Sequence, residues 1–304
     1  MRTNRRGVIG AVLLAVALVA TACGSGDGAD PADGPGVVIG SQDFGESAIV
    51  AEIYKGALEA EGFTASIQAV GGFRDLELAA FEAGDINLAP EYAASMLEFL
   101  NGFAGEATGD AVATTELLNG ELESIGLVAL EPSDAVDTNA LVVTSETSQE
   151  LGLTKLSELA DHPELVLGGP PDCETNAFCI PGLLEVYGVD LGATFQPLDA
   201  GQITVQALEA GQIDIALLFS TSGVIADRGF VLLEDDQGML AADNVLPVLT
   251  TELEEAYGSS ITDVLNDVSS KLTTADLTAM NKRFDIDNED PDDIAADWLA
   301  DNGF

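Results

Sequence analysis

A ten-residue phrase occurs twice in this chain, and its recurrence constrains the fold more than any other feature. Residues 80–89 read AFEAGDINLA and residues 207–216 read ALEAGQIDIA, with six identical positions at an offset of 127 residues. Each copy has the pattern of a helix stopped by glycine and followed by a short apolar strand. An aromatic residue follows in both copies, Tyr92 in the first and Phe219 in the second. Chance reuse of a common phrase is the alternative, but the matching context favours two similar α/β lobes.

Strands and helices alternate through the region that contains the first copy. Short apolar runs at 37–40, 65–70 and 86–89 predict strands, and the spacing of apolar residues within 46–61 and 75–83 predicts helices. This alternation predicts an α/β fold with mostly parallel sheets. Ligands bind beyond the carboxyl ends of the strands in such sheets, so two lobes with facing strand ends would enclose a cleft.

Two further predicted strands mark the places where the chain crosses between the lobes. Residues 138–143 predict a strand that enters the second lobe, and residues 244–249 predict one that returns to the first. We therefore expect lobe 1 to comprise residues 37–138 plus 245–304, and lobe 2 to comprise residues 139–244. Helical periodicity dominates the C-terminal segment after the second crossing.

The N-terminus has the features of an export signal rather than of a folded domain. Three arginines precede an apolar stretch of 14 residues, which is short for a membrane span but typical of a secretory signal. Small residues then lead to Cys23, a pattern similar to bacterial lipoprotein signals, so we interpret residues 1–23 as a leader with a lipidated Cys23. An ordinary secretory signal with a coincidental cysteine is the alternative. Residues 24–36, with five glycines and two prolines, predict a flexible tether.

The charge balance excludes several classes of protein. The chain has 53 acidic and 10 basic residues, a formal net charge of -43, yet 47% of its residues are apolar. That apolar content suffices for a core and excludes a disordered acidic chain. The lack of clustered Lys and Arg excludes nucleic-acid binding and argues against docking on an anionic membrane surface. Without the leader only seven basic residues remain, which disfavours ligands that need a guanidinium or ammonium partner.

Cys173 and Cys179 are the two cysteines left after the leader, in a segment flanked by Pro and Gly. An exported protein occupies an oxidising compartment, so we expect a local disulfide that rigidifies a loop. No His lies nearby, and two thiols alone make a poor zinc site. We therefore expect neither a metal nor a cofactor.

Six motifs together carry a resemblance that covers nearly all of the mature chain: IGSQDFGES (39–47), AEIYKGALEAEGF (51–63), AGDINLAPEY (83–92), LDAGQITVQALEAGQIDI (198–215), FSTSG (219–223) and VLLEDD (231–236). They resemble the extracytoplasmic binding proteins of ABC importers for osmoprotectants such as glycine betaine, choline and carnitine. The resemblance implies a type II periplasmic-binding fold, with two lobes that close on a ligand. It also implies an ABC permease as partner. We expect a monomer.

The resemblance also implies an aromatic cage for the ligand. A quaternary ammonium donates no hydrogen bonds, and aromatic faces hold it by cation–π attraction. Tyr92 and Phe219 match cage positions, whereas Asn139 stands where many members have an aromatic residue, and residues 241–246 lack a common aromatic pair. The cage is thus thinner than in relatives. Further ligand contacts are expected from Phe44, Ser41, Thr175, Asn176, Ser220 and Thr221.

Some of these residues have structural alternatives. Phe44 has lobe packing as its alternative role, and Ser41 has capping of the next helix. Arg74 could pair with a ligand carboxylate, but a surface ion pair with an acidic residue is the favoured interpretation.

The sequence therefore predicts a lipid-anchored, extracytoplasmic solute-binding protein that delivers a quaternary amine to a permease. The alternative ligand is another small zwitterionic or neutral solute, such as an amino-acid derivative. An enzyme is disfavoured, because the chain has one His and no nucleophile motif, phosphate loop or metal-ligand cluster. A structural or adhesive lipoprotein would not need a paired cleft.

Overall fold

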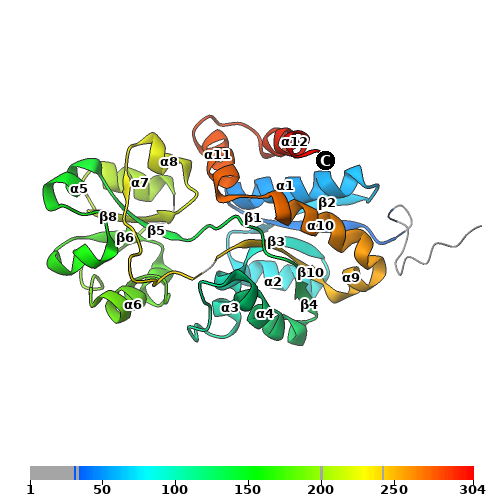
Figure 1. The fold of residues 1–304 in the computed structure, drawn as a ribbon, viewed down its shortest axis with the longest axis horizontal. Coiled ribbons are helices and arrows are strands. Elements are labelled where there is room, and N and C mark those ends of the chain that lie inside the picture. The colour runs from blue at the N-terminus through cyan, green and yellow to red at the C-terminus, as the bar shows by residue number, and fades with distance from the viewer. Residues whose placement is uncertain (1–30, 32–33, 199–200, 242) are drawn as a thin grey trace, which may run out of the picture.

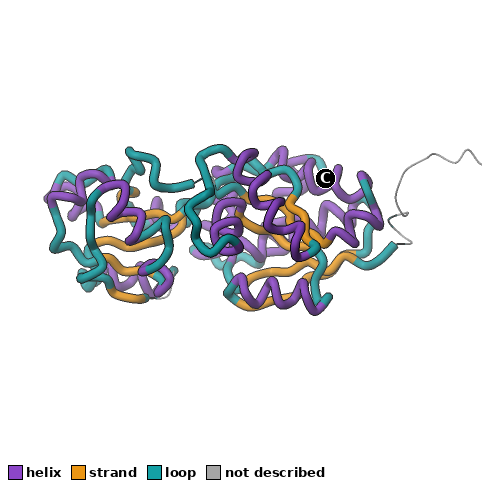
Figure 2. The backbone as a smooth tube through the Cα atoms, turned by 90° about the horizontal axis from the view of Figure 1, so that it is seen from below, coloured by secondary structure: helices purple, strands orange, loops and turns teal. Residues whose placement is uncertain are grey.

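The structure is a computed structural model that describes residues 31, 34–198, 201–241 and 243–304. The described chain forms two α/β lobes joined by crossing segments, as Figure 1 shows from one side and Figure 2 from below. The predicted leader with Cys23, and most of the predicted tether, lie outside the described residues. Within the part of the chain that is described, no helix is both long and apolar enough to cross a membrane.

Lobe 1 is built on a five-stranded sheet with the order β2-β1-β3-β10-β4. β1 pairs in parallel with β2 and β3, whereas β10 runs antiparallel to both β3 and β4. The crossing strand therefore runs against its four companions. The strands are β1 (Val37–Gln42), β2 (Ala65–Gly71), β3 (Leu88–Tyr92), β4 (Leu127–Ala129) and β10 (Val245–Thr250).

Lobe 2 repeats this topology with the order β7-β6-β8-β5-β9, in which β6 is parallel to β7 and β8, and β5 is antiparallel to β8 and β9. The strands are β5 (Asn139–Val143), β6 (Leu167–Gly169), β7 (Gln196–Pro197), β8 (Ile215–Phe219) and β9 (Val231–Leu232). The repeated phrase becomes α2 (Arg74–Ala83) with β3 and α7 (Gln202–Glu209) with β8, at equivalent places in the two sheets. The predicted two-lobed α/β fold is confirmed.

Helices cover both faces of the lobe 1 sheet. One apolar core packs α1 and the C-terminal helices around the fully buried Tyr54 and Tyr257, and a second core packs α3 and α4 on the other face. Trp298 docks the last helix into the first core. The helices are α1 (Gly45–Ala60), α3 (Ala93–Leu100), α4 (Ala111–Leu122), α9 (Thr251–Tyr257), α10 (Ser259–Lys271), α11 (Thr274–Asp285) and α12 (Pro291–Asn302).

Lobe 2 is smaller and has shorter helices, namely α5 (Ser145–Leu151), α6 (Ile180–Gly182) and α8 (Gly223–Asp227). The predicted disulfide between Cys173 and Cys179 is present. Both cysteines are buried in the core of lobe 2, and the expected rigidifying effect on the loop stays a prediction. Cys173 lies in a 3-10 turn (Pro171–Glu174), and Cys179 immediately precedes α6.

The two crossing segments pair with each other between the lobes. Asp137 N donates to Asp243 O at 3.1 Å, and Val245 N donates to Ala135 O at 2.9 Å. The lobes also meet where α8 approaches α11. A Cβ at Gly223 would lie 2.6 Å from the Lys282 Cα, so only glycine permits this approach. The hinge is therefore a short two-stranded ribbon beside a close contact between helices.

Candidate functional site

The two repeated strands end in the predicted aromatic residues, but the two rings differ in exposure. Tyr92 ends β3 and is 9% exposed, whereas Phe219 ends β8 and is 40% exposed. The Phe44 ring lies just before α1, with its centroid 6.3 Å from that of Tyr92. Asn139 is the β5 partner of Phe219. The structure thus brings Tyr92 and Phe44 together in lobe 1, and Phe219 and Asn139 together in lobe 2.

A buried carboxylate that the sequence reasoning did not single out, that of Glu46, connects the two lobes. Tyr92 Oη donates to Oε1 at 2.7 Å, and Thr221 Oγ1 and Asn281 Nδ2 donate to Oε2 at 2.7 and 2.5 Å. Burial raises the pKa of Glu46, and the three hydrogen bonds oppose that rise. Thr221 follows the lobe 2 strand β8, whereas Tyr92 and Asn281 belong to β3 and α11. One carboxylate therefore bridges the lobes.

A second buried carboxylate, that of Asp137, lies in the crossing segment. Ser220 Oγ and Thr221 N both donate to Asp137 Oδ1 at 3.1 Å. Burial raises the pKa of Asp137 well above its usual range, and the nearby Glu46 raises it further. Ser220 and Thr221 therefore have protein partners in this conformation, and their ligand contacts stay predictions.

A small cavity of about 20 Å³ lies between the lobes. Lobe 1 supplies the start of α3, and lobe 2 supplies the start of β5 and the loop that the disulfide closes. Two predicted contact residues, Asn139 and Asn176, line it, and sequence reasoning missed the others. The lining residues are Ala94, Ser95, Thr138, Asn139, Asn176, Phe178, Leu240, Ala241 and Asp243.

Asp243 is the one carboxylate among the lining residues of this cavity. Its Oδ1 accepts a hydrogen bond from Ser95 N at 2.9 Å, and its Oδ2 accepts one from the Ser95 hydroxyl. Burial raises the pKa of Asp243 to about 6, which these hydrogen bonds oppose. On the opposite wall Asn139 Nδ2 donates to Phe178 O at 3.1 Å, which leaves the amide oxygen of Asn139 as a further acceptor.

Seven of the nine predicted contact residues do not line the cavity, and Ser41 and Thr175 are two of them. Ser41 is buried, and its hydroxyl donates to Gln42 O at 3.3 Å. Thr175 is exposed, and its hydroxyl donates to Asp172 O at 3.3 Å. Neither arrangement tests a contact with ligand, so both roles stay predictions.

Arg74 corrects the expectation of a surface ion pair. Its Nε and Nη2 atoms donate to Glu91 at 2.6 and 2.7 Å, and its Nη1 atom donates to Ser95 O at 3.1 Å. Glu91 is fully buried, and Arg74 lowers its pKa despite the opposing effect of burial. The adjacent Glu77 is also fully buried, and burial together with Glu91 raises its pKa to about 10. Gln42 Nε2 donates to Glu77 Oε2 at 3.1 Å, so these groups form one network at the strand ends of lobe 1.

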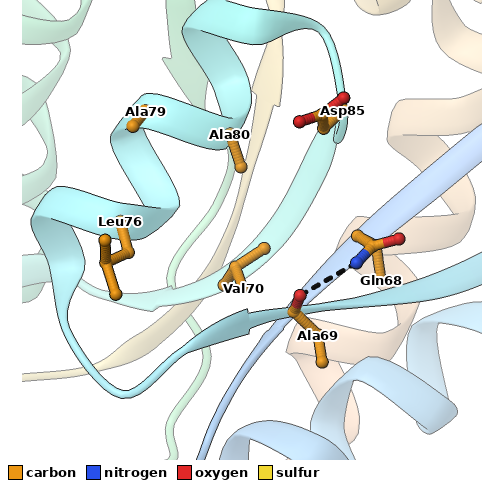
Figure 3. A pocket seen from close by; sticks show the side chains of 7 residues that line it. All are labelled: Gln68, Ala69, Val70, Leu76, Ala79, Ala80 and Asp85. Carbon is orange, nitrogen blue, oxygen red and sulfur yellow. Dashed lines mark hydrogen bonds between the residues drawn. The ribbon is translucent and has the colours of Figure 1, made fainter.

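A larger groove of about 290 Å³ lies on lobe 1 between β2 and α2 (Figure 3). Small and aliphatic side chains dominate its lining, with Gln68 and Asp85 as its polar members. Gln68 Nε2 donates to Ala69 O at 2.9 Å. The lining contains no aromatic ring, so the groove does not suit the cation–π recognition that the sequence predicts.

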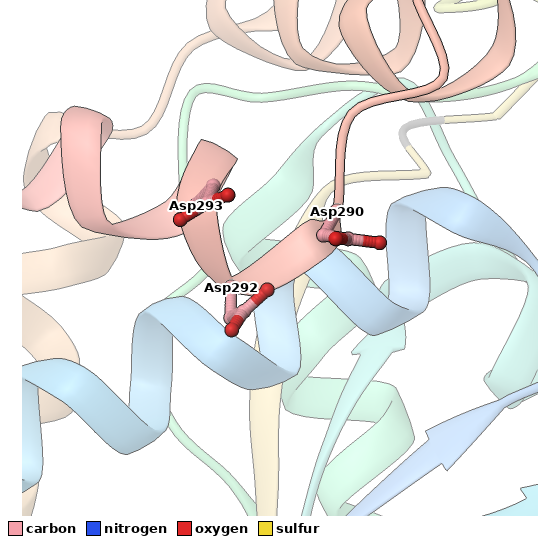
Figure 4. Close-up of side chains that lie close together, drawn as sticks. All are labelled: Asp290, Asp292 and Asp293. Carbon is pink, nitrogen blue, oxygen red and sulfur yellow. The ribbon is translucent and has the colours of Figure 1, made fainter.

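Three aspartates gather at the start of α12 (Figure 4). Asp290, Asp292 and Asp293 are exposed, and one carboxylate oxygen of each lies within 4.8 Å of the others. Carboxylates are favourable in the first turn of a helix because they complement its dipole. Their position therefore has a structural explanation that needs no bound ion.

Comparisons with known proteins agree with the geometry of the lobes. Residues 35–301 match the family described as the substrate binding domain of ABC-type glycine betaine transport systems. A glycine-betaine-binding protein of Pseudomonas aeruginosa is 26% identical over 275 residues, which is 87% of each chain. The glycine betaine-binding protein YehZ of Escherichia coli is 23% identical and covers 88% of this chain and 91% of its own. A crystal structure titled as a glycine betaine/carnitine/choline ABC transporter aligns with a TM-score of 0.72 and 23% identity, over 87% of this chain and 98% of that one.

Proposed function

Because this chain belongs to the family of substrate-binding domains of ABC-type glycine betaine transport systems, we propose that it captures a quaternary amine between its lobes and delivers it to a membrane permease. Binding proteins of this family are not a class of enzymes, and the proposed role involves no chemistry on the ligand. The ligand class is glycine betaine, which is named for both sequence relatives, or choline, which is named with it for the structural neighbour.

The observation that carries the proposal is the cavity to which both lobes contribute and which Phe178 lines, together with the aromatic residues that end β3 and β8. Tyr92 and Phe44 lie in lobe 1, and Phe219 and Phe178 lie in lobe 2. Each aromatic face that meets a quaternary ammonium contributes roughly 0.5–2 kcal/mol by cation–π attraction. A cavity of about 20 Å³ holds about one water molecule, so the lobes must part to admit such a ligand and then close on it.

The N-terminus supports a location outside the cytoplasm, where the binding proteins of ABC importers act. We propose that the leader is cleaved before Cys23, that this cysteine is lipidated, and that residues 24–36 hold the lobes away from the membrane. Mass spectrometry of the N-terminal peptide tests this directly. A Cys23→Ser variant should appear in the soluble fraction, and retention of that variant in the membrane would contradict lipid anchoring.

Binding is tested by isothermal titration calorimetry on the full-length chain in detergent. The panel contains choline, glycine betaine, carnitine and, for the alternative ligand class, unmodified amino acids. Saturable binding of at least one quaternary amine, weakened about tenfold or more in Tyr92→Ala, is the expected result. The proposal fails if no quaternary amine binds and an amino acid does.

A further inference from the structure

The ionisable groups at and near the cavity between the lobes are acidic. Asp243 lines the cavity, and Asp137 lies on the crossing segment paired with it, where Asp137 N donates to Asp243 O at 3.1 Å. Glu46 shares Thr221 as a hydrogen-bond donor with Asp137. All three side chains are buried, at 5–8% exposure. One carboxylate, that of Asp243, therefore lines the cavity, and two more buried carboxylates, those of Asp137 and Glu46, are connected to it through the crossing segment and Thr221.

No basic side chain lines the cavity beside Asp243. Among its lining residues, all of which the structure describes, there is no Lys or Arg. The charge of Arg74 lowers the pKa of Asp243, but each of the three guanidinium nitrogens of Arg74 already donates to Glu91 or to the Ser95 carbonyl. It therefore neutralises the network inside lobe 1. The polar groups that face the cavity from the opposite wall are the amides of Asn139 and Asn176.

We propose that this site selects solutes with a net positive charge and no carboxylate, such as choline, over zwitterions such as glycine betaine, with Asp243 as the residue that determines the preference. This inference rests on the proposed function and narrows its ligand class. A trimethylammonium group near Asp243 gains attraction in a space from which water is largely excluded. A ligand carboxylate held there would lose its hydration next to like charges and find no guanidinium or ammonium partner.

The burial of Asp243 supports this reading. A buried carboxylate with a fully compensating cation keeps a low pKa, as Glu91 does beside Arg74. Asp243 instead has a pKa raised to about 6 by burial. A cationic ligand would supply the missing counter-charge, whereas a zwitterion would bring a second carboxylate with it.

Choline and glycine betaine form a matched pair for the test, because they share the trimethylammonium group and differ in hydroxymethyl against carboxylate. Calorimetry on the full-length chain should show choline binding about tenfold or more tightly. The neutral isostere 3,3-dimethyl-1-butanol should also bind about tenfold or more weakly than choline, because it keeps the shape and loses the charge.

The Asp243→Asn variant should reduce the ratio of choline to betaine affinity about tenfold, since an amide can still accept from Ser95 N. Asp292→Asn on exposed α12 is the control with the same change in net charge, and it should leave the ratio unchanged. If the Asp243→Asn variant does not fold, the comparison of choline with its neutral isostere in the unchanged protein still tests whether the positive charge of the ligand is needed for tight binding. Betaine binding as tightly as choline overturns the inference and leaves the proposed function standing. Failure of every quaternary amine to bind overturns both.

Discussion

The two lobes have the same strand order and differ in what their strand ends carry. In lobe 1 the aromatic end of β3 is buried, and its hydroxyl is bound to Glu46. In lobe 2 the equivalent residue of β8, Phe219, is 40% exposed, and its side chain has no polar atom. The repeated backbone therefore places an aromatic residue at each edge of the cleft, while the neighbouring residues decide whether its ring is fixed in advance or available for contact.

The lobes also differ in the interactions that stabilise the interior of each. Lobe 1 buries the Arg74–Glu91–Glu77 network at its strand ends and has apolar cores on both faces of its sheet. Lobe 2 has shorter helices and a disulfide within its main core. The comparison shows that one topology can be stabilised by different chemistry. The following predictions test this difference, from the largest expected effect to the smallest.

Removal of the Arg74 charge should have the largest effect. Arg74→Met leaves Glu91 buried and unpaired, and loss of one partner of a buried ion pair costs about 3–5 kcal/mol. Urea denaturation followed by circular dichroism measures this loss. Arg228→Met in lobe 2 is the matched control, because Arg228 forms only exposed pairs, which are worth about 0–1 kcal/mol. Equal losses in the two variants would contradict the contrast between the lobes.

Removal of the disulfide should weaken lobe 2. In the Cys173→Ala/Cys179→Ala double variant the unfolded chain regains the entropy of a loop with a sequence separation of 6, worth about 2 kcal/mol. The thermal unfolding of lobe 2 should move to lower temperature, as a reducing agent should also cause in the unchanged protein. An unaltered unfolding profile in both experiments would show that the bond does not stabilise this lobe.

Glu77→Gln should stabilise lobe 1 at high pH. The pKa of Glu77 is raised to about 10 in the folded chain, so between pH 5 and 9 the folded state holds a proton that the unfolded state releases. The free energy of unfolding therefore falls as pH rises through that range. The Gln side chain does not titrate, so the variant does not lose this stability. The gain should be near zero at pH 4.5 and should grow above that by up to about 1.4 kcal/mol per pH unit. A gain that does not depend on pH would rule out titration of Glu77 as its cause.

The aromatic strand ends should show the smallest changes in stability and the clearest division of roles. Tyr92→Phe removes one hydrogen bond to Glu46 and should cost about 1 kcal/mol of stability. Phe219→Leu keeps apolar bulk, so stability should change by less than about 0.5 kcal/mol while affinity for a quaternary amine falls about fivefold. Thermal unfolding and calorimetry on the same two variants separate the effects. A Phe219→Leu variant that binds normally would exclude this ring from the site.

Sequence reasoning identified the features whose signals are local. The repeated phrase predicted α2, β3, α7 and β8, and the crossing strands were predicted within a few residues of their positions. The helical character of the C-terminal segment was also predicted. The two neighbouring cysteines predicted their disulfide. Helices α3 and α4 were not predicted, although Asp110 caps α4 through its contacts with Val112 N and Ala113 N.

The buried carboxylates could not be recognised in the same way, because their partners are distant in sequence. Glu46 reads as an ordinary acidic residue in the first turn of a helix, and only the fold brings Thr221 and Asn281 to it across 175 and 235 residues. Arg74 likewise reads as a surface cation until β3 places Glu91 beside it. With 53 acidic residues in the chain, no single one stands out by composition.

The size of the cavity between the lobes has a kinetic consequence. A space of about 20 Å³ is too small to hold a trimethylammonium group, so the lobes must be farther apart than in this conformation when the ligand enters or leaves. Exchange then requires the Thr221–Glu46 hydrogen bond to break and α8 to separate from α11 at Gly223. Both the association and the dissociation rates should follow the frequency of that opening rather than diffusion, so the contacts between the lobes, and not only those with the ligand, set the residence time of the ligand.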